Sequence, residues 1–154
     1  MFSRFYDHAQ HGPDSAACMF SMVKTVAAAN PAMAVTQFPR QPFNQPSVIA
    51  RIPGSSSDLV IMGAHYDSKG GGADARAPGA VDNASGVVAL LEALRILAGA
   101  GFKPKDTIEF HFYAGEEGGM LGLADVFAKY KADAKTVLAM VNQDIRSLDL
   151  RHTD

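Results

Sequence analysis

The sequence predicts an α/β fold with a mixed, mainly parallel central sheet that is flanked by helices. Apolar segments typical of strands alternate along the chain with segments of helical periodicity. The segment Leu59–Ala64 is apolar throughout, as expected of a strand that is covered on both faces. A length of 154 residues suits one domain, and no repeat or linker divides the chain. We therefore expect residues 1–154 to form a single domain.

The N-terminal part predicts one helix and an irregular connection. Residues 12–15 (Gly-Pro-Asp-Ser) are typical of a helix start with the Asp or the Ser as cap, and apolar residues then recur at helical spacing up to Ala29. We expect Asn30 and Pro31 to end this helix, because proline disfavours helical backbone in the residue before it. The segment 36–46 contains three prolines and is expected to be extended and irregular.

The remaining elements follow from the period of the apolar residues. In the segment 107–113, Ile108, Phe110 and Phe112 alternate with residues that carry polar groups, which predicts a strand with one packed face. We expect His111, on the other face, to pack as a covered polar group and not to bind a metal ion. The expected strands are 47–52, 59–64, 107–113 and 137–141, and the expected helices are 84–98 and 118–132.

The composition excludes several functional classes. The chain is 47% hydrophobic and 19% charged, which indicates a folded protein and not a disordered one. With 14 basic against 16 acidic residues, the formal charge of −2 argues against nucleic acid as a partner. No apolar run approaches the roughly 18 residues needed to span a bilayer, so no membrane span is expected. The single cysteine, Cys18, cannot form an internal disulfide.

Residues able to bind metal ions or to transfer protons stand where predicted strands end, or just before the predicted helix 84–98. In open α/β sheets ligands bind beyond the carboxyl ends of the strands, so we expect these side chains to converge. Imidazole and carboxylates together suit zinc, manganese or a similar divalent ion. The set comprises His65, Asp67, Asp82, Glu116, Glu117 and Asp144.

The residue types permit distinct roles within such a site. Asp82 could bridge two ions, and the spacing of two between His65 and Asp67 lets the carboxylate orient the imidazole. Of Glu116 and Glu117, one could bind a metal ion while the other acts as general base. Ordinary structural roles stay open for each residue taken singly: His65 as a hydrogen-bonded loop residue, the two glutamates as a helix start, and Asp82 as a helix cap. Their joint occurrence favours the metal site.

Several blocks agree in order and spacing with one known family. The most specific are GAHYDS at 63–68, APGAVDNASG at 77–86 and YAGEEGG at 113–119, and SVIARIPG at 47–54 and VNQD at 141–144 agree as well. On these blocks the chain resembles the M28 family of zinc aminopeptidases, and in particular the secreted leucine-aminopeptidase-like members of fungi and bacteria. The resemblance covers about residues 14–146 and implies a zinc-exopeptidase-like fold.

The resemblance also implies a two-zinc site. His65 and Asp144 would bind one zinc ion, Asp82 would bridge both ions, and Glu117 would bind the second. The family completes its second site with a histidine far downstream, and we do not assign this role to His152. The family domain is also longer, so the resemblance implies an incomplete, C-terminally short version of it.

For catalysis, the resemblance implies that Glu116 is the general base that deprotonates the attacking water and that Asp67 supports His65. The implied substrates are peptides with a free N-terminus, which lose their N-terminal residue. The resemblance implies secretion, whereas the first residues lack the pattern of a signal peptide, so a cytoplasmic location stays open. The alternative is a truncated, catalytically impaired homologue that acts by binding, with a homo-oligomer covering the incomplete sheet.

Overall fold

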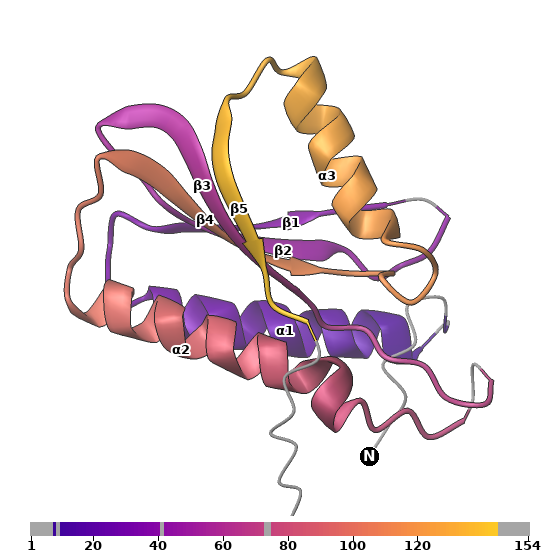
Figure 1. The fold of residues 1–154 in the computed structure, drawn as a ribbon. Coiled ribbons are helices and arrows are strands. Elements are labelled where there is room, and N and C mark those ends of the chain that lie inside the picture. Colours follow the sequence, from indigo (N-terminus) through magenta and orange to yellow (C-terminus); the bar gives the residue numbers. More distant parts are fainter. Residues whose placement is uncertain (1–7, 9, 41, 73–74, 145–154) are drawn as a thin grey trace, which may run out of the picture.

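The computed structural model of the chain describes residues 8, 10–40, 42–72 and 75–144. A five-stranded sheet of order β1-β2-β4-β3-β5 has α1 and α2 on one face and α3 on the other (Figure 1). No helix in these ranges is long and apolar enough to cross a bilayer. The elements are α1 His11–Ala27, β1 Ala34–Phe38, β2 Ser47–Ile52, β3 Ser56–His65, a kinked turn Ala80–Ala84, α2 Ser85–Gly99, β4 Asp106–Tyr113, α3 Leu121–Ala132 and β5 Val137–Asn142.

The strand directions determine where the functional residues meet. β3 runs parallel to both of its neighbours, β4 and β5, whereas β2 runs antiparallel to β1 and to β4. Four of the five strands therefore point in one direction and only β2 opposes them. This confirms the predicted α/β fold with a mixed, mainly parallel sheet. It also brings the carboxyl ends of β4, β3 and β5 to the same edge of the sheet.

Two segments near the N-terminus differ from the sequence prediction. The prediction of an irregular connection over 36–46 is wrong in part, because β1 extends to Phe38 and pairs with β2 along its whole length. This exposed edge strand is held by its ladder to β2, which local apolar periodicity does not reveal. In addition, α1 begins at His11, so Pro13 lies in the first turn. Backbone N–H groups of the first turn have no partner within the helix, so a proline there costs no hydrogen bond.

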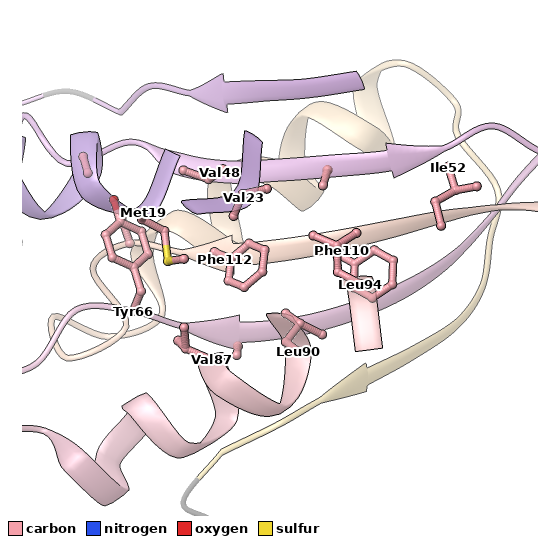
Figure 2. Packing of buried hydrophobic residues seen from close by; sticks show 14 of the residues in the cluster. Met19, Val23, Val48, Ile52, Tyr66, Val87, Leu90, Leu94, Phe110 and Phe112 are labelled. Carbon is pink, nitrogen blue, oxygen red and sulfur yellow. The ribbon is translucent and has the colours of Figure 1, made fainter. Parts of the chain in front are cut away.

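An apolar core lies between the sheet and the helices α1 and α2. Figure 2 shows Phe110 and Phe112 of β4 among side chains from both helices, and both phenylalanines are fully buried. The helical contributions recur four residues apart, which places them on one face of each helix. The main partners are Met19 and Val23 of α1, Val48 and Ile52 of β2, and Leu90 and Leu94 of α2.

The opposite face of β4 is buried as well, so the expectation of a single packed face is wrong. α3 covers this face, and the polar groups beneath it satisfy one another. His111 Nε2 lies 2.9 Å from Glu109 Oε2, and His111 Nδ1 lies 2.9 Å from the hydroxyl of Tyr113. The hydroxyl of Tyr130 on α3 donates to Glu109 Oε2 at 2.6 Å. His111 is thus a covered polar group, as predicted.

Truncation of a core side chain tests the packing of α2. We expect Leu94→Ala, at a position with 0% exposure, to lower the free energy of unfolding by about 2–5 kcal/mol, because the lost apolar contacts leave a cavity. The matched control on the same helix is Val88→Ala, at a position that is 63% exposed, which we expect to change stability by less than about 0.5 kcal/mol. Urea unfolding measures both, and equal losses would contradict the assignment of the core face.

The polar network under α3 predicts a pH dependence of stability. Burial lowers the pKa of His111 below its ordinary 6.5. The pKa of Glu109 is also lowered, because hydrogen bonds from His111 and Tyr130 outweigh the opposing effect of burial. A group whose pKa is lowered by folding stabilises the folded state when the pH is above the pKa of the unfolded chain. This stabilisation is lost as the pH falls toward the lower pKa of the folded state.

We therefore expect urea unfolding, in chelator, to show a loss of up to about 1.4 kcal/mol per pH unit as the pH falls below the ordinary histidine value of 6.5. His111→Gln removes the titrating ring and is expected to flatten this part of the profile. The same slope in both proteins would show that the network does not couple to protons.

Candidate metal centre

The chemistry-bearing residues predicted from the sequence lie at one edge of the sheet. His65 is the last residue of β3, Glu116 and Glu117 follow β4, and Asp144 follows β5 by two residues. Asp82 lies in the kinked turn before α2. Because β4, β3 and β5 are adjacent and parallel, their carboxyl ends bring these residues together, as the sequence analysis expects.

His65 presents a buried ring nitrogen to three carboxylates. Its Nε2 lies 3.1 Å from Asp82 Oδ1, 3.4 Å from Asp144 Oδ1 and 3.8 Å from Glu116 Oε2. The side chain is 1% exposed, and Nε2 has no hydrogen-bond partner among the described residues. A cation would satisfy a buried polar atom that lacks a hydrogen bond and has anionic oxygens around it.

Asp67 determines the orientation of the His65 ring. Nδ1 of His65 lies 3.2 Å from the backbone carbonyl oxygen of Asp67 and 3.4 Å from its Oδ1. Nδ1 therefore carries a proton that it donates to Asp67, which leaves Nε2 as the nitrogen available to a metal ion. The structure thus places Asp67 in contact with the ring, at the position that the sequence spacing predicts.

The carboxylate of Asp67 also connects β3 to the loop after β4. It is fully buried, and it accepts hydrogen bonds from the backbone N–H groups of Glu116, at 3.1 Å to Oδ1, and of Glu117, at 3.1 Å to Oδ2. Charge-assisted bonds of this kind offset the cost of burying a carboxylate. They also set the backbone position of both glutamates relative to His65.

Glu116 lies beside the candidate ligands and is 31% exposed. Burial raises the pKa of its carboxyl above the ordinary value. Neighbouring carboxylates, Asp67 first among them, raise it further against the opposing charge of His65. A carboxylate with a raised pKa accepts a proton from water more readily than an ordinary one, which is a property required of a general base.

Glu117 has different surroundings from its neighbour. Its Oε2 lies 3.1 Å from the Lys69 ammonium nitrogen, and its Oε1 accepts a hydrogen bond from the backbone N–H of Lys69 at 3.2 Å. Of the four residues predicted as metal ligands, three form a group in which one ligand atom from each lies within 4.8 Å of the others: His65, Asp82 and Asp144. Glu117 is not part of this group.

Asn83 is a positioning residue whose full role the sequence analysis missed. Its Oδ1 accepts the backbone N–H of Gly86, in the first turn of α2, at 3.1 Å. Its Nδ2 donates to the carbonyl of Gln143 at 2.7 Å, a contact between distant segments that has no local sequence signal. These bonds connect the start of α2 to the end of β5, and so hold Asp82 near Asp144. The peptide bond between Asp82 and Asn83 is cis.

The electrostatics of the group favour positive charge at His65. Burial alone would lower the pKa of the ring, but its hydrogen bond to Asp67 and the surrounding carboxylates raise the pKa to about 9. A metal ion at Nε2 takes the place of the proton, so metal binding is coupled to proton release.

The three donors fit a divalent ion. One imidazole nitrogen and two carboxylate oxygens suit zinc, and catalytic zinc sites use three protein ligands and keep one position open. A cavity of about 50 Å³ adjoins the group, with His65, Glu116 and Asp144 in its lining. This is enough room for a water molecule beside the carboxylate of Glu116.

Replacing Asp67 tests its role in the centre. In Asp67→Asn an amide NH2 faces a buried donor, so we expect a loss of about 1–3 kcal/mol in the free energy of unfolding. Because the ring of His65 loses the carboxylate beside its Nδ1 and keeps only the backbone carbonyl of residue 67, we expect zinc affinity, measured by competition with a chelating dye, to fall about 10–100-fold. Asp14→Asn, at a carboxylate that is 60% exposed on α1, is the control, and equal effects in both variants would contradict the assignment.

Comparisons with known proteins identify the family of this chain. The model of the family described as Peptidase family M28 matches residues 47–151. A probable leucine aminopeptidase of Trichophyton verrucosum is 47% identical over 156 residues, which cover 94% of this chain and 41% of the relative. One from Arthroderma otae is 51% identical over 117 residues, which cover 72% of this chain and 31% of the relative. The chain thus spans well under half the length of these relatives.

Solved structures show the same fold. The Legionella pneumophila LapA aminopeptidase superposes with a TM-score of 0.84 at 26% identity, over 94% of this chain and 39% of that one. LapB from the same organism gives a TM-score of 0.82 at 26% identity, with the same coverage of both chains. The family match extends over more than half of the sequence and includes every residue of the candidate centre. The chain therefore belongs to peptidase family M28.

Proposed function

We propose that the chain forms part of a zinc-dependent aminopeptidase that removes N-terminal residues from peptides. Membership of the M28 family supports peptidase chemistry, and the relatives are named probable leucine aminopeptidases. The observation that carries the proposal is the buried Nε2 of His65, which faces Asp82 and Asp144 without a hydrogen-bond partner. Because the chain spans 41% of such a relative, the activity and substrates of the whole protein are part of this proposal.

The M28 family is zinc-dependent, and we propose that His65, Asp82 and Asp144 hold a zinc ion in this chain. When bound, zinc would polarise the scissile carbonyl and lower the pKa of a water at the open position. A second ion, implied by the resemblance, would share Asp82 and take Glu117. Asp82 and Glu117 are the ligands of a second ion that we identify in this sequence.

Glu116 is the proposed general base. Its carboxylate lines the cavity beside His65 and Asp144, so a water in this cavity lies within reach of it. Glu116 takes a proton from the water as the water oxygen bonds to the carbonyl carbon, and it returns the proton to the amine nitrogen as the C–N bond breaks. The convergence of these groups gives no support to the alternative of an impaired homologue that acts only by binding.

The charge of the site accounts for exopeptidase action. With a divalent ion at His65, the charges of Asp82 and Asp144 balance that of the ion, and the carboxylate of Glu116 remains as the negative group that would attract the ammonium group at the free N-terminus of a peptide. Internal peptide bonds offer no such cation. A peptide bound by its terminal ammonium places its first peptide bond nearest to the centre.

The proposed homo-oligomer would form at β5. Among the described residues β5 pairs with β3 alone, and its Leu138 and Val141 are 54% and 51% exposed. An edge strand with unpaired backbone groups and exposed apolar side chains favours pairing with another chain.

The general-base assignment is tested by Glu116→Gln. The amide keeps the size of the side chain but cannot accept a proton from water, so we expect hydrolysis of a leucine anilide by the zinc-loaded chain to fall by about 10²–10⁴-fold. Circular dichroism and zinc content are expected to stay those of the original chain. Treatment with a chelator is expected to abolish hydrolysis, and added zinc to restore it.

The control for this variant is Glu92→Gln, which changes an exposed glutamate of α2 that pairs with Arg95. We expect Glu92→Gln to leave hydrolysis unchanged. Full activity of Glu116→Gln would remove Glu116 from the mechanism. A folded, zinc-loaded chain that does not hydrolyse the anilide would contradict the proposed activity of this chain.

A further inference from the structure

Both carboxylate oxygens of Glu117 contact Lys69, a residue of the loop after β3. One oxygen lies 3.1 Å from Nζ of Lys69, and the other accepts the backbone N–H of the same lysine at 3.2 Å. The Glu117 side chain is only 10% exposed, so water competes little for these contacts. An ammonium group thus stands where a metal ion would bind if Glu117 were a ligand.

More than one carboxylate acts on the ammonium group of Lys69. The hydrogen bond and the charge of Glu117 raise the pKa of its ammonium group, and the charges of Glu116 and Asp82 add to this effect. The direct contacts of Lys69 in this cluster are those with Glu117. Its side chain is 59% exposed, so the ammonium group can leave for solvent when another cation arrives.

The two cation positions of the cluster are consequently unequal. At the first, His65 Nε2 has no hydrogen-bond partner among the described residues and faces Asp82 and Asp144. At the second, a cation must displace Lys69 from Glu117 and then bind near its positive charge. Like charges a few ångströms apart repel each other even in water, and the repulsion is twice as large when one of them is a divalent ion.

From this contrast we propose that Lys69 is a built-in counter-cation of Glu117 that competes with a second metal ion. The chain then holds one divalent ion tightly at His65, Asp82 and Asp144, and a second ion only weakly. The inference rests on the proposed metal centre, since it concerns the occupancy of the same cluster. It makes Lys69 a determinant of metal stoichiometry.

The test is the stepwise affinity for Zn²⁺, measured on the full chain by equilibrium dialysis with elemental analysis and by titration calorimetry. Lys69→Met removes the charge, keeps the length of the side chain and retains the backbone N–H that bonds to Glu117. We expect the second step of binding to tighten about tenfold or more, and the first step to change by less than about twofold. Because Lys69 is exposed, we expect circular dichroism to show an unchanged fold.

Two further variants isolate the charge and the carboxylate. Lys69→Arg keeps a cation beside Glu117, and we expect its second step to match that of the original chain. Adding Glu117→Gln to Lys69→Met is expected to abolish the gain, because the carboxylate that the second ion uses is then gone. A gain that persists in the double variant would place the second ion elsewhere and would overturn the proposal.

The outcomes also separate this inference from the proposed centre. The proposed role of Lys69 is overturned if the second zinc ion binds with the same affinity to Lys69→Met and to the original chain, or binds to neither. In that case binding of the first zinc ion still supports the centre at His65. Failure of the first step in the original chain contradicts the centre at His65 itself, and with it this inference.

Discussion

The site depends on the hydrogen bonds that the buried carboxylate of Asp67 accepts. Removing a carboxylate from water is costly unless donors replace the water, and here the donors are the backbone N–H groups of Glu116 and Glu117, with the ring of His65 beside them. Because these donors come from the ends of different strands, satisfying Asp67 also fixes the end of β3 against the loop after β4. The parallel sheet brings the strand ends to one edge. The hydrogen bonds of Asp67 then fix the distance between His65 and the two glutamates.

A second buried polar side chain does the same for β5. Asn83 bonds to both the start of α2 and the end of β5, and a side chain at Gly86 would collide with it, since a Cβ there would lie 2.4 Å from Asn83 Oδ1 and 2.6 Å from the carbonyl oxygen of Gln143. Glycine is therefore required at this close approach. These two hydrogen bonds join the segment of Asp82 to that of Asp144, and both carboxylates then lie within 3.4 Å of His65 Nε2.

Local sequence patterns predicted those features that depend on local chemistry. The apolar run of β3, the periodicity of α2 and the polar residues after each strand gave the fold class and the convergence of His65 with Asp144. Features that depend on distant partners escaped prediction. β1 is held by pairing with β2, the polar face of β4 is covered by α3 at Tyr130, and the contact of Lys69 with Glu117 joins segments 48 residues apart. Periodicity cannot report such contacts, because each becomes favourable only after the chain has folded.

The concentration of carboxylates has an energetic cost that explains why the centre is suited to cations. Several anionic groups lie close together. Their charges add to burial in raising the pKa of Glu116, and they add to the hydrogen bond with Asp67 in raising the pKa of His65 to about 9. Lys69 offsets part of this repulsion at the exposed side of the cluster. The remaining negative charge faces Nε2 of His65, which has no hydrogen-bond partner among the described residues. A divalent ion relieves that repulsion only in the folded chain, because only there do the ligands meet, so binding of the ion and stability of the fold are thermodynamically linked.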